Sequence, residues 1–374
     1  MHVYHQIRFS ARGREFQSTL NKRVNSFFQE NGISKHANLA MRFKTIVMFS
    51  LYFAPFSLLL SGVTSHPLGV LALYALMGIG LAGIGLSVMH DACHQAYSSK
   101  KWVNELLAYS LNMLGASSFN WKVQHNVLHH TFTNVHEVDE DIASRGVLRL
   151  TPDAPVKKIH RYQHWYAWFL YGLMTFVWVF FKDYDRLMRY RKNGLIKQVK
   201  ASFTKELVIL LITKVVYLGY IFGLPFLLTD LPWYLILGGF FVMHYIAGFI
   251  LAIIFQPAHV TTETSYVLPD EDGKLDHIFA VHQLLTTANF APKSHLFSWY
   301  VGGLNYQVEH HLFPTICHIH YQKISKIVEE TAKEFGLPYH TTPTFWEALV
   351  QHGQHLKALG QGQMGSVQPS LSLR

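Results

Sequence analysis

The sequence is poor in cysteine and in charged residues, and each shortage excludes a class of protein. Among 374 residues there are two cysteines, Cys93 and Cys317, and only 15% of the residues are charged. Two thiols are too few for a disulfide framework, so we expect a reduced active side that faces the cytosol. The first 40 residues contain no long apolar run, so we expect no cleavable signal peptide. No internal repeat is visible.

Apolar residues take the place of the missing charge. Half of the residues are hydrophobic and 14% are aromatic, a composition typical of integral membrane proteins. The formal net charge is +9, from 32 basic and 23 acidic residues. In a membrane protein such an excess indicates topology, so we expect no nucleic-acid partner.

Four apolar runs are long enough to cross a bilayer, which takes about 20 residues at a rise of about 1.5 Å each. The predicted spans are, in chain order, Phe43–Thr64, Leu68–Met89, Glu206–Leu228 and Trp233–Gln256. The links at 65–67 and 229–232 each contain a proline and are short enough to predict tight hairpins.

Histidine is the residue in excess, with 24 copies, of which seven lie in three tight clusters. The clusters are His90-Asp-Ala-Cys-His94, His125-Asn-Val-Leu-His129-His130 and Gln307-Val-Glu-His310-His311. Residues at i and i+4 of a helix share a face, so both imidazoles of such a pair can reach one metal ion. A single histidine is usually only a hydrogen-bonded polar residue, but three clusters with ligand spacing predict metal binding.

The number of histidines bears on the metal. A structural zinc ion takes four protein ligands, and a catalytic one takes three. Seven imidazoles therefore predict two metal ions, and imidazole suits Zn, Cu, Fe and Ni alike. The sequence has no Glu-x-x-His pair, which excludes the carboxylate-bridged di-iron bundle of soluble proteins.

We expect two further helices, at 102–119 and 165–181, to lie at the membrane interface and not to cross the bilayer. A fifth span at Trp165–Phe181 would place the third histidine cluster on the opposite side of the membrane from the others, so we interpret this aromatic run as interfacial. Segment 182–205 carries eight Lys and Arg residues and the hairpin links carry none. By the positive-inside rule, both termini are cytoplasmic.

The three clusters resemble the histidine boxes of the membrane fatty acid desaturases. Gln307 stands where most members have the first histidine of the third box, which is a mark of the front-end group that includes delta-6 and delta-5 desaturases. The surrounding residues are also similar, at 131–134, 139–142, 286–290 and 299–306. The resemblance covers about residues 40–330.

The resemblance implies an all-α integral membrane fold, with four transmembrane helices and a cytosolic helical cap that holds a histidine-rich di-iron site. It implies a segmentation into a cytosolic N-terminal segment (1–42), the desaturase domain (43–330), C-terminal cytosolic helices (331–360) and a disordered tail (361–374). The activity implied is the O2-dependent removal of two hydrogens from a methylene pair of a fatty acyl chain, with iron doing the oxidation.

The family's ligand positions carry over to eight histidines of this sequence. They are His90, His94, His125, His129, His130, His259, His310 and His311. The fit of His259 is the weakest, since a lone histidine can simply cap a helix end. Gln307 is a ligand or a supporting residue. Asp91, like Asp139 and Asp141, either supports neighbouring imidazoles or is only a surface acid.

Two ionisable residues, Lys214 and His244, fall inside predicted spans, where charge is costly. His244 could line a narrow apolar tunnel for the acyl chain, or it could form a hydrogen bond between helices. Burial of each methylene of the substrate, at about 0.8 kcal/mol, would set the register in such a tunnel.

The implied partners are an acyl lipid or acyl thioester substrate, O2, membrane lipid and an electron donor. Many eukaryotic front-end enzymes carry a fused cytochrome b5 domain with a His-Pro-Gly-Gly motif. The nearest string here, His66-Pro67-Leu68-Gly69, lies in a hairpin link. We therefore expect a separate donor, a ferredoxin or a cytochrome b5-type protein, as in bacterial members, and a location in a bacterial inner membrane.

Three alternatives remain from the residues themselves. His90-Asp91-x-x-His94 resembles the zinc motif His-Glu-x-x-His, which predicts an intramembrane protease, but this leaves the other clusters unexplained. A metal transporter, the non-enzyme alternative, would have its ligands near the middle of the bilayer. A hydroxylase or ketolase on the same scaffold differs only in its reaction outcome.

Overall fold

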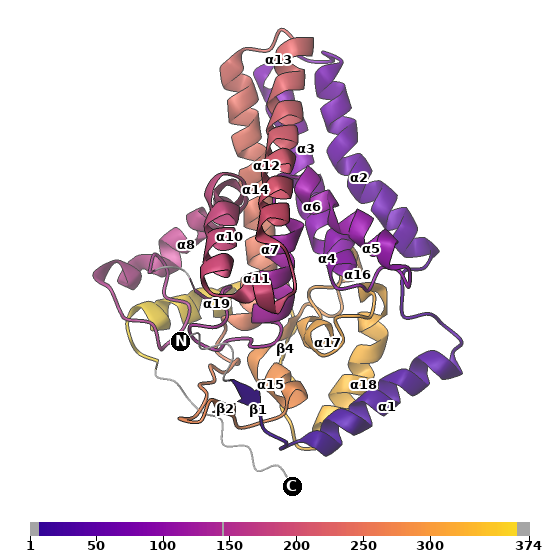
Figure 1. Cartoon of the computed structure of the whole chain (residues 1–374), viewed down its shortest axis with the longest axis vertical. Helices are drawn as coiled ribbons and strands as arrows, with labels where there is room; N and C mark the ends of the chain where they lie inside the picture. Colours follow the sequence, from indigo (N-terminus) through magenta and orange to yellow (C-terminus); the bar gives the residue numbers. More distant parts are fainter. Residues whose placement is uncertain (1–6, 144–145, 365–374) are drawn as a thin grey trace. The chain divides into compact units, whose positions relative to one another are not determined.

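The computed structural model describes residues 7–143 and 146–364, and nearly all of its regular structure is helical (Figure 1). We expect a disordered tail at 361–374, and residues 365–374 of it lie outside the described residues. The chain divides into two compact units, each made of stretches that are not consecutive in sequence. Unit 1 comprises 1–36, 124–167 and 254–374, and unit 2 comprises 37–123 and 168–253.

Unit 2 contains most of the apolar sequence. Its elements are α2 (Leu39–Leu60), α3 (Pro67–Gly83), η2 (Ile84–Met89), α4 (His90–Cys93), α5 (Lys101–Ala108), α6 (Ser110–Met113), α7 (Ser118–Lys122), α9 (Met174–Val177), η5 (Trp178–Lys182), α10 (Asp183–Lys192), α11 (Leu195–Gln198), α12 (Phe203–Leu218), η6 (Gly219–Gly223) and α13 (Leu224–Leu228). Three helices begin in one unit and end in the other: η3 (Val123–His129), α8 (Gln163–Gly172) and α14 (Trp233–His259).

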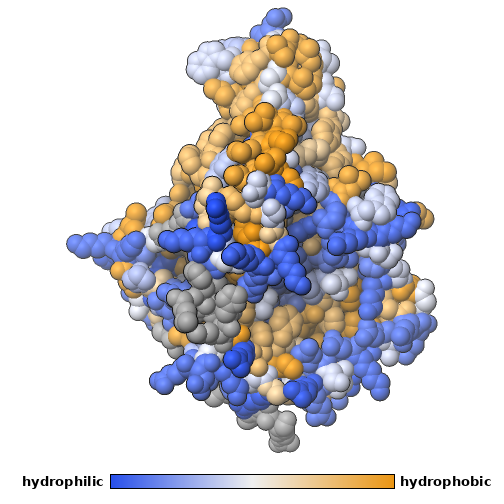
Figure 2. Space-filling model, in the orientation of Figure 1, coloured by the Kyte–Doolittle hydropathy of each residue, from blue (hydrophilic) through white to orange (hydrophobic). Residues whose placement is uncertain are grey.

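Among the described residues, four continuous helices are long and apolar enough to span a membrane, which confirms the predicted number. They are Leu39–Leu60, Pro67–Cys93, Phe203–Leu228 and Trp233–His259. Much of their surface is exposed and apolar, as the orange upper part of Figure 2 shows. Because exposed apolar side chains over such a length need a non-aqueous solvent, the protein is an integral membrane protein.

Small residues let the spans approach closely. A Cβ atom on Gly80 of α3 would lie 2.6 Å from the backbone carbon of Leu51 in α2. A Cβ atom on Gly78 would lie 2.6 Å from the carbonyl oxygen of Met243 in α14. Glycine at these two positions therefore allows α3 to pack against both neighbours, as small residues do at membrane helix contacts.

The aromatic run that begins at Trp165, which we expect to be interfacial, is divided into shorter helical pieces. It is divided among α8, α9 and η5, and it is not among the four apolar helices of spanning length. The segment 102–119, expected as one surface helix, consists of α5, α6 and the start of α7. Trp102 and Leu106 on α5 are exposed.

Unit 1 combines short strands with helices from both ends of the chain. Its elements are β1 (Arg8–Phe9), α1 (Arg14–Glu30), η4 (Lys158–Tyr162), β2 (Lys274–Leu275), α15 (Phe279–Thr286), β3 (Asn289–Phe290), α16 (His295–Tyr300), α17 (Gln307–Leu312), η7 (His318–His320), α18 (Tyr321–Glu334), β4 (Thr341–Thr342) and α19 (Phe345–Gly360). The strand pairs β1–β2 and β3–β4 are parallel.

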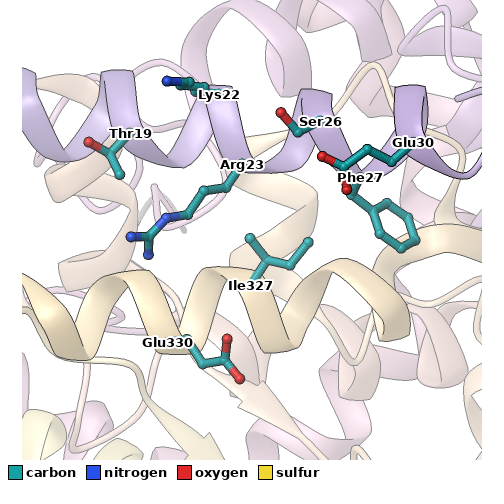
Figure 3. A pocket seen from close by; sticks show the side chains of 8 residues that line it. All are labelled: Thr19, Lys22, Arg23, Ser26, Phe27, Glu30, Ile327 and Glu330. Carbon is teal, nitrogen blue, oxygen red and sulfur yellow. The ribbon is translucent and has the colours of Figure 1, made fainter.

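The core of unit 1 forms where α1 packs on α15 and α18. An apolar residue recurs every four positions of α1, at Phe16, Leu20, Val24 and Phe28, and all four are buried in one cluster with residues of α15 and α18. This spacing places them on one helix face. Beside the packed face, a groove of about 640 Å³ runs between α1 and α18, with Arg23 at its edge (Figure 3).

Candidate metal centre

The second histidine cluster lies on a π-helical turn. In η3 the backbone N–H of His130 donates to the carbonyl of His125 at 2.8 Å, an i to i+5 bond. This wider turn brings positions i, i+4 and i+5 to one side, whereas α-helical spacing predicted only the pair at i and i+4. As a result, the Nε2 atoms of His125 and His130 lie 3.2 Å apart. Single π turns of this kind often occur at functional sites.

The third cluster adds its histidines from α17. The Nε2 atom of His310 lies 2.8 Å from the Nε2 atom of His130, so three ring nitrogens from η3 and α17 meet. The helix that carries His310 is held by Asn289, whose Oδ1 accepts from the N–H of Val308 at 2.9 Å. The Nδ1 atom of His310 lies 3.2 Å from the hydroxyl of Tyr321.

A second group of three brings together the ends of η3, α14 and α17. Ligand atoms of His129, His259 and His311 lie within 4.8 Å of one another, and all three residues are fully buried. Their Nε2 atoms have no hydrogen-bond partner among the described residues. A buried polar atom without a hydrogen-bond partner lowers the stability of the fold by about 1–3 kcal/mol. Three such atoms at one point therefore indicate a site for a bound ligand.

The opposite nitrogen of each ring is held by an acceptor. The contacts of Nδ1 are from His129 to Asp139 at 3.0 Å, from His259 to the Thr286 carbonyl at 3.2 Å, and from His311 to Gln283 Oε1 at 2.8 Å. Because each partner can only accept, Nδ1 carries the proton and the lone pair of Nε2 points into the group. This is the tautomer that binds metal, fixed by the surrounding residues.

The pKa values of His129 and His311 are shifted in opposite directions. Burial lowers the pKa of His129, but the charge and hydrogen bond of Asp139 outweigh it, so the pKa is raised above its ordinary value. Burial and the neighbouring imidazoles lower the pKa of His311 well below its ordinary value. A carboxylate on Nδ1 therefore makes the His129 ring a stronger donor, while the ring of His311 stays neutral.

Several supporting residues could not be identified from the sequence. Gln283 on α15 accepts from the ring of His311 and donates to the carbonyl of His130 at 3.0 Å. Thr133 contacts Gln283 Oε1 at 3.0 Å. Their only sequence signal is proximity to the histidine clusters or to residues 286–290, which resemble the family. Asp139, for which the sequence allows either support of an imidazole or a surface position, is buried and contacts Nδ1 of His129 at 3.0 Å.

Glu309 lies between the ligand candidates of the third cluster but faces away from them. Its carboxylate accepts from Asn289 Nδ2 and from the hydroxyl of Tyr339, each at 2.9 Å. Burial raises its pKa to about 7, against the effect of these two donors. The contacts anchor α17 to β3 and to the segment before β4.

The first cluster belongs to unit 2. There η2, a π-helical stretch, leads into α4, and the rings of His90 and His94 lie with centroids 4.8 Å apart. Both rings meet the ring of Trp121 edge-on, at 5.4 and 5.7 Å. Asp91 between them is buried, and its carbonyl accepts from the N–H of Ala96 at 2.8 Å. Unit 2 thus offers one buried pair of imidazoles.

His244 and Gln307 are the remaining candidates. His244 in α14 forms hydrogen bonds with Tyr217 and Thr175 of unit 2. Gln307 is the first residue of α17 and is buried, and its Oε1 has no hydrogen-bond partner among the described residues. The described structure thus brings six of the eight predicted ligands together in unit 1 and pairs the other two in unit 2.

This donor set fits iron. It consists of neutral imidazoles, which suit Fe, Zn, Cu and Ni. Unit 1 alone supplies two groups of three, one of His125, His130 and His310 and one of His129, His259 and His311. A single four-coordinate zinc ion would leave at least two of the six unused.

Comparison with known proteins connects this arrangement to an activity. The sequence pattern of the family described as fatty acid desaturase matches residues 65–343. The sn-1 linoleoyl-lipid 6-desaturase of Synechocystis sp. is 37% identical over 358 residues, which cover 95% of this chain and 98% of that protein. The acyl-lipid (8-3)-desaturase of Physcomitrium patens is 38% identical, covering 94% of this chain and 72% of that protein. Delta(5) fatty acid desaturase A of Dictyostelium discoideum is 30% identical, covering 92% of this chain and 75% of that protein.

Proposed function

The chain belongs to the fatty acid desaturase family, and on that premise we propose that it is a front-end desaturase acting on the acyl chains of membrane lipids at a di-iron centre. The observation that carries the proposal is the group of His129, His259 and His311, whose buried Nε2 atoms converge and have no hydrogen-bond partner within residues 7–143 and 146–364.

The protein is an enzyme, an oxidoreductase that desaturates fatty acyl groups. The family match and the names of the relatives favour this activity over the zinc protease and the metal transporter. The reaction converts a methylene pair, O2, two electrons and two protons into a double bond and two water molecules.

Two iron ions would be held by the eight histidines. Three of them, His129, His259 and His311, would hold one ion, and His125, His130 and His310 would contribute to the other. We propose that His90 and His94 complete this ligand set, as in the family. Iron bound there supplies the power to oxidise an unactivated C–H bond with O2.

The protein positions the imidazole rings and shields them from water. Asp139, Gln283 and the carbonyl of Thr286 fix the ring orientation of one ligand group, and Tyr321 contacts the ring of His310. Supporting contacts of this kind set the basicity of metal ligands. Full burial of the rings also excludes water, which would otherwise compete for the metal and for reactive oxygen. Gln307 and Asp91 are proposed to be supporting residues or additional ligands.

The proposed substrate is an acyl lipid, since the relatives from Synechocystis and Physcomitrium are named for acyl-lipid desaturation. Front-end action would place the new double bond between an existing one and the carboxyl group. His244 remains a candidate for the wall of an acyl tunnel. Its ring centroid is 4.5 Å from that of Phe240, and since both ring nitrogens are hydrogen-bonded it would present carbon atoms.

A separate donor, ferredoxin or cytochrome b5-type, is proposed to supply the electrons from the cytoplasmic side, where both termini would lie. The distribution of basic residues supports this topology. The proposed location is a bacterial inner membrane. The proposed segments 1–42, 43–330 and 331–360 follow the extent of the resemblance.

The test is expression of the chain in a host with a defined fatty-acid pool, with each new product located by mass spectrometry. We expect acyl chains with one added double bond on the carboxyl side of an existing one, and none from a His311→Ala variant. Hydroxylated acyl chains in place of alkenes would assign the chain to the hydroxylases instead.

A further inference from the structure

A basic segment of unit 2 lies immediately before the third span. It consists of α10, α11 and the link to α12, and from Arg186 to Lys205 it contains no acidic residue. Figure 2 shows hydrophilic side chains gathered over α10 and α11. The proposed chemistry at the histidine clusters makes no use of this segment.

Some of its cations are used within the protein. Arg186 is buried, and Arg189 forms an ion pair with Asp185 at 2.9 Å. The guanidinium of Arg191 lies over the ring of Phe203, 4.2 Å from its centre. Arg186 and Arg191 therefore contribute to the packing of α10, and Arg189 pairs with a carboxylate of α10 itself.

Three lysines are left with their charge in solvent. Lys192, Lys197 and Lys200 are exposed, and none has a carboxylate partner among the described residues. We name these three the lysine surface.

The lysine surface is held in place by the backbone. Gly194 adopts a left-handed conformation with φ of 75°, which turns the chain after α10. The two residues that follow, Leu195 and Ile196, are buried. This anchored turn directs Lys197 and Lys200 outward, so the charges belong to a folded surface.

The adjacent span places this surface at the level of lipid headgroups. On α12 the apolar residues Val208, Ile212 and Val215 are exposed, which defines a lipid-facing side. Val208 is three residues after Lys205, or about 4.5 Å along the helix. Because each headgroup layer is only about 5–8 Å thick, the residues just before Lys205 lie within or next to it.

Apolar residues beside the lysines favour a membrane over an acidic protein as the partner. Phe181, which lies in η5 two residues before α10, and Met188 in α10 are 66% and 49% exposed. A basic surface next to exposed apolar side chains and a lipid-facing span matches the headgroup and the upper acyl region of a lipid layer together.

We propose that Lys192, Lys197 and Lys200 bind the phosphate groups of anionic phospholipids in the leaflet next to α10–α11. The lipids bound there surround the protein and are distinct from the acyl substrate, so this proposal does not depend on the proposed function. The bound lipids would hold α10 and the start of α12 at a fixed depth.

The test uses the purified full-length protein, delipidated in a neutral detergent. Binding of phosphatidylglycerol and of phosphatidylcholine is titrated by native mass spectrometry. Each lysine should contribute a few-fold, so the variant Lys192→Gln/Lys197→Gln/Lys200→Gln should bind phosphatidylglycerol at least about tenfold more weakly. Its binding of phosphatidylcholine should be unchanged, and the difference should shrink with added salt.

A matched control removes the same charge from unit 1. Lys293, Lys323 and Lys326 are also exposed, and their triple Gln variant should bind phosphatidylglycerol like the parent. A variant with Arg in place of the lysine surface should also bind it like the parent, because charge is retained, and it separates loss of charge from misfolding.

Equal loss in both triple Gln variants would overturn the proposal, because binding would then follow net charge alone. Failure of the Arg variant to bind would overturn it as well. Unchanged lipid binding with weaker binding of an acidic donor protein would overturn it in favour of a protein-docking surface.

Discussion

Two buried polar regions of the molecule, one in each unit, use histidine in opposite ways. In unit 2 the Nε2 atom of His244 lies 2.6 Å from the hydroxyl of Tyr217, and its Nδ1 atom lies 3.1 Å from the hydroxyl of Thr175. Both nitrogens have a protein partner. In unit 1 His259, fifteen residues later on the same helix, has its Nδ1 on the Thr286 carbonyl, and in the described part of the chain its Nε2 has no hydrogen-bond partner.

The difference separates a histidine whose two nitrogens are both used by the fold from a histidine that we propose as a metal ligand. An unpartnered nitrogen alone is not enough: Nδ1 of His355 is unpartnered too, while its Nε2 bonds to Tyr266 at 3.0 Å. What distinguishes His259 is convergence, since its ligand atom meets those of His129 and His311 within 4.8 Å. A ligand histidine thus has one nitrogen fixed by the protein and the other converging with its neighbours.

The largest expected difference in activity and iron content is between alanine variants of the two α14 histidines, His259 and His244. His259→Ala should abolish desaturation and lower the iron content, because it removes one of three converging donors. His244→Ala should retain its iron and lower stability by only about 1–3 kcal/mol, through the unpaired partners it leaves. Iron is measured by plasma emission and activity by product yield. If His244→Ala lost as much iron as His259→Ala, the contact pattern of a histidine would not separate metal ligands from structural residues.

The polar region of unit 2 should affect stability and leave the metal unchanged. Nζ of Lys214 is buried against Asp183 Oδ2 at 2.8 Å and the carbonyl of Gly115 at 2.6 Å. Asp183 also accepts from the N–H of Ser117 at 2.9 Å. Lys214→Met leaves Asp183 charged and buried, so we expect a loss of about 3–5 kcal/mol.

Adding Asp183→Asn to Lys214→Met should recover part of that stability, because the buried charge is then removed. Unfolding in detergent, followed by tryptophan fluorescence, gives the free energies for the double-mutant cycle. A double variant less stable than Lys214→Met alone would show that Asp183 matters through its hydrogen bonds to the backbone and not through its charge.

Patterns of neighbouring residues in the sequence are enough to predict the spans and the histidine clusters. How the histidines pair depends on contacts that only the folded structure shows. Span length and the i, i+4 spacing of His90 and His94 are properties of neighbouring residues. The pairing of His125 with His130 depends on an i to i+5 bond that α-helical periodicity does not predict. The π turn therefore had to be seen in the structure.

The distinction between His244 and His259 also lies outside local sequence. Both follow apolar stretches of α14, and what separates them is Tyr217 and Thr175 in one case and Thr286 in the other. These partners are 27–69 residues away in the chain. Resemblance to the family singled out His259, and contacts between distant segments supply the physical reason.

The next prediction concerns the carboxylate that holds His129. Asp139→Asn keeps the size of the side chain but removes the charge beside Nδ1, and activity or iron affinity should fall about 10–100-fold. Asp141→Asn is the matched control, since it lies 3.8 Å from the same nitrogen and forms no hydrogen bond to it. Its effect on iron affinity, measured by chelator competition, should be clearly smaller. The reverse order would assign the supporting role to Asp141.

The smallest effect is expected at Gln307, which tests whether convergence or burial defines a ligand. Its Oε1 is buried without a hydrogen-bond partner among the described residues, as are the Nε2 atoms of several proposed ligands, but it is an amide oxygen and not a ring nitrogen. Gln307→His should therefore keep its iron and lose less than about tenfold in rate, because the added ring alters the surroundings of the metal without removing a donor. His310→Gln should lose iron and activity, since an amide oxygen holds iron less well than an imidazole whose Nδ1 is held by Tyr321. Product yield and iron content are measured for both purified variants. If Gln307→His loses its iron while His310→Gln keeps both metals, the amide is the ligand and convergence of ring nitrogens does not identify the metal-binding set.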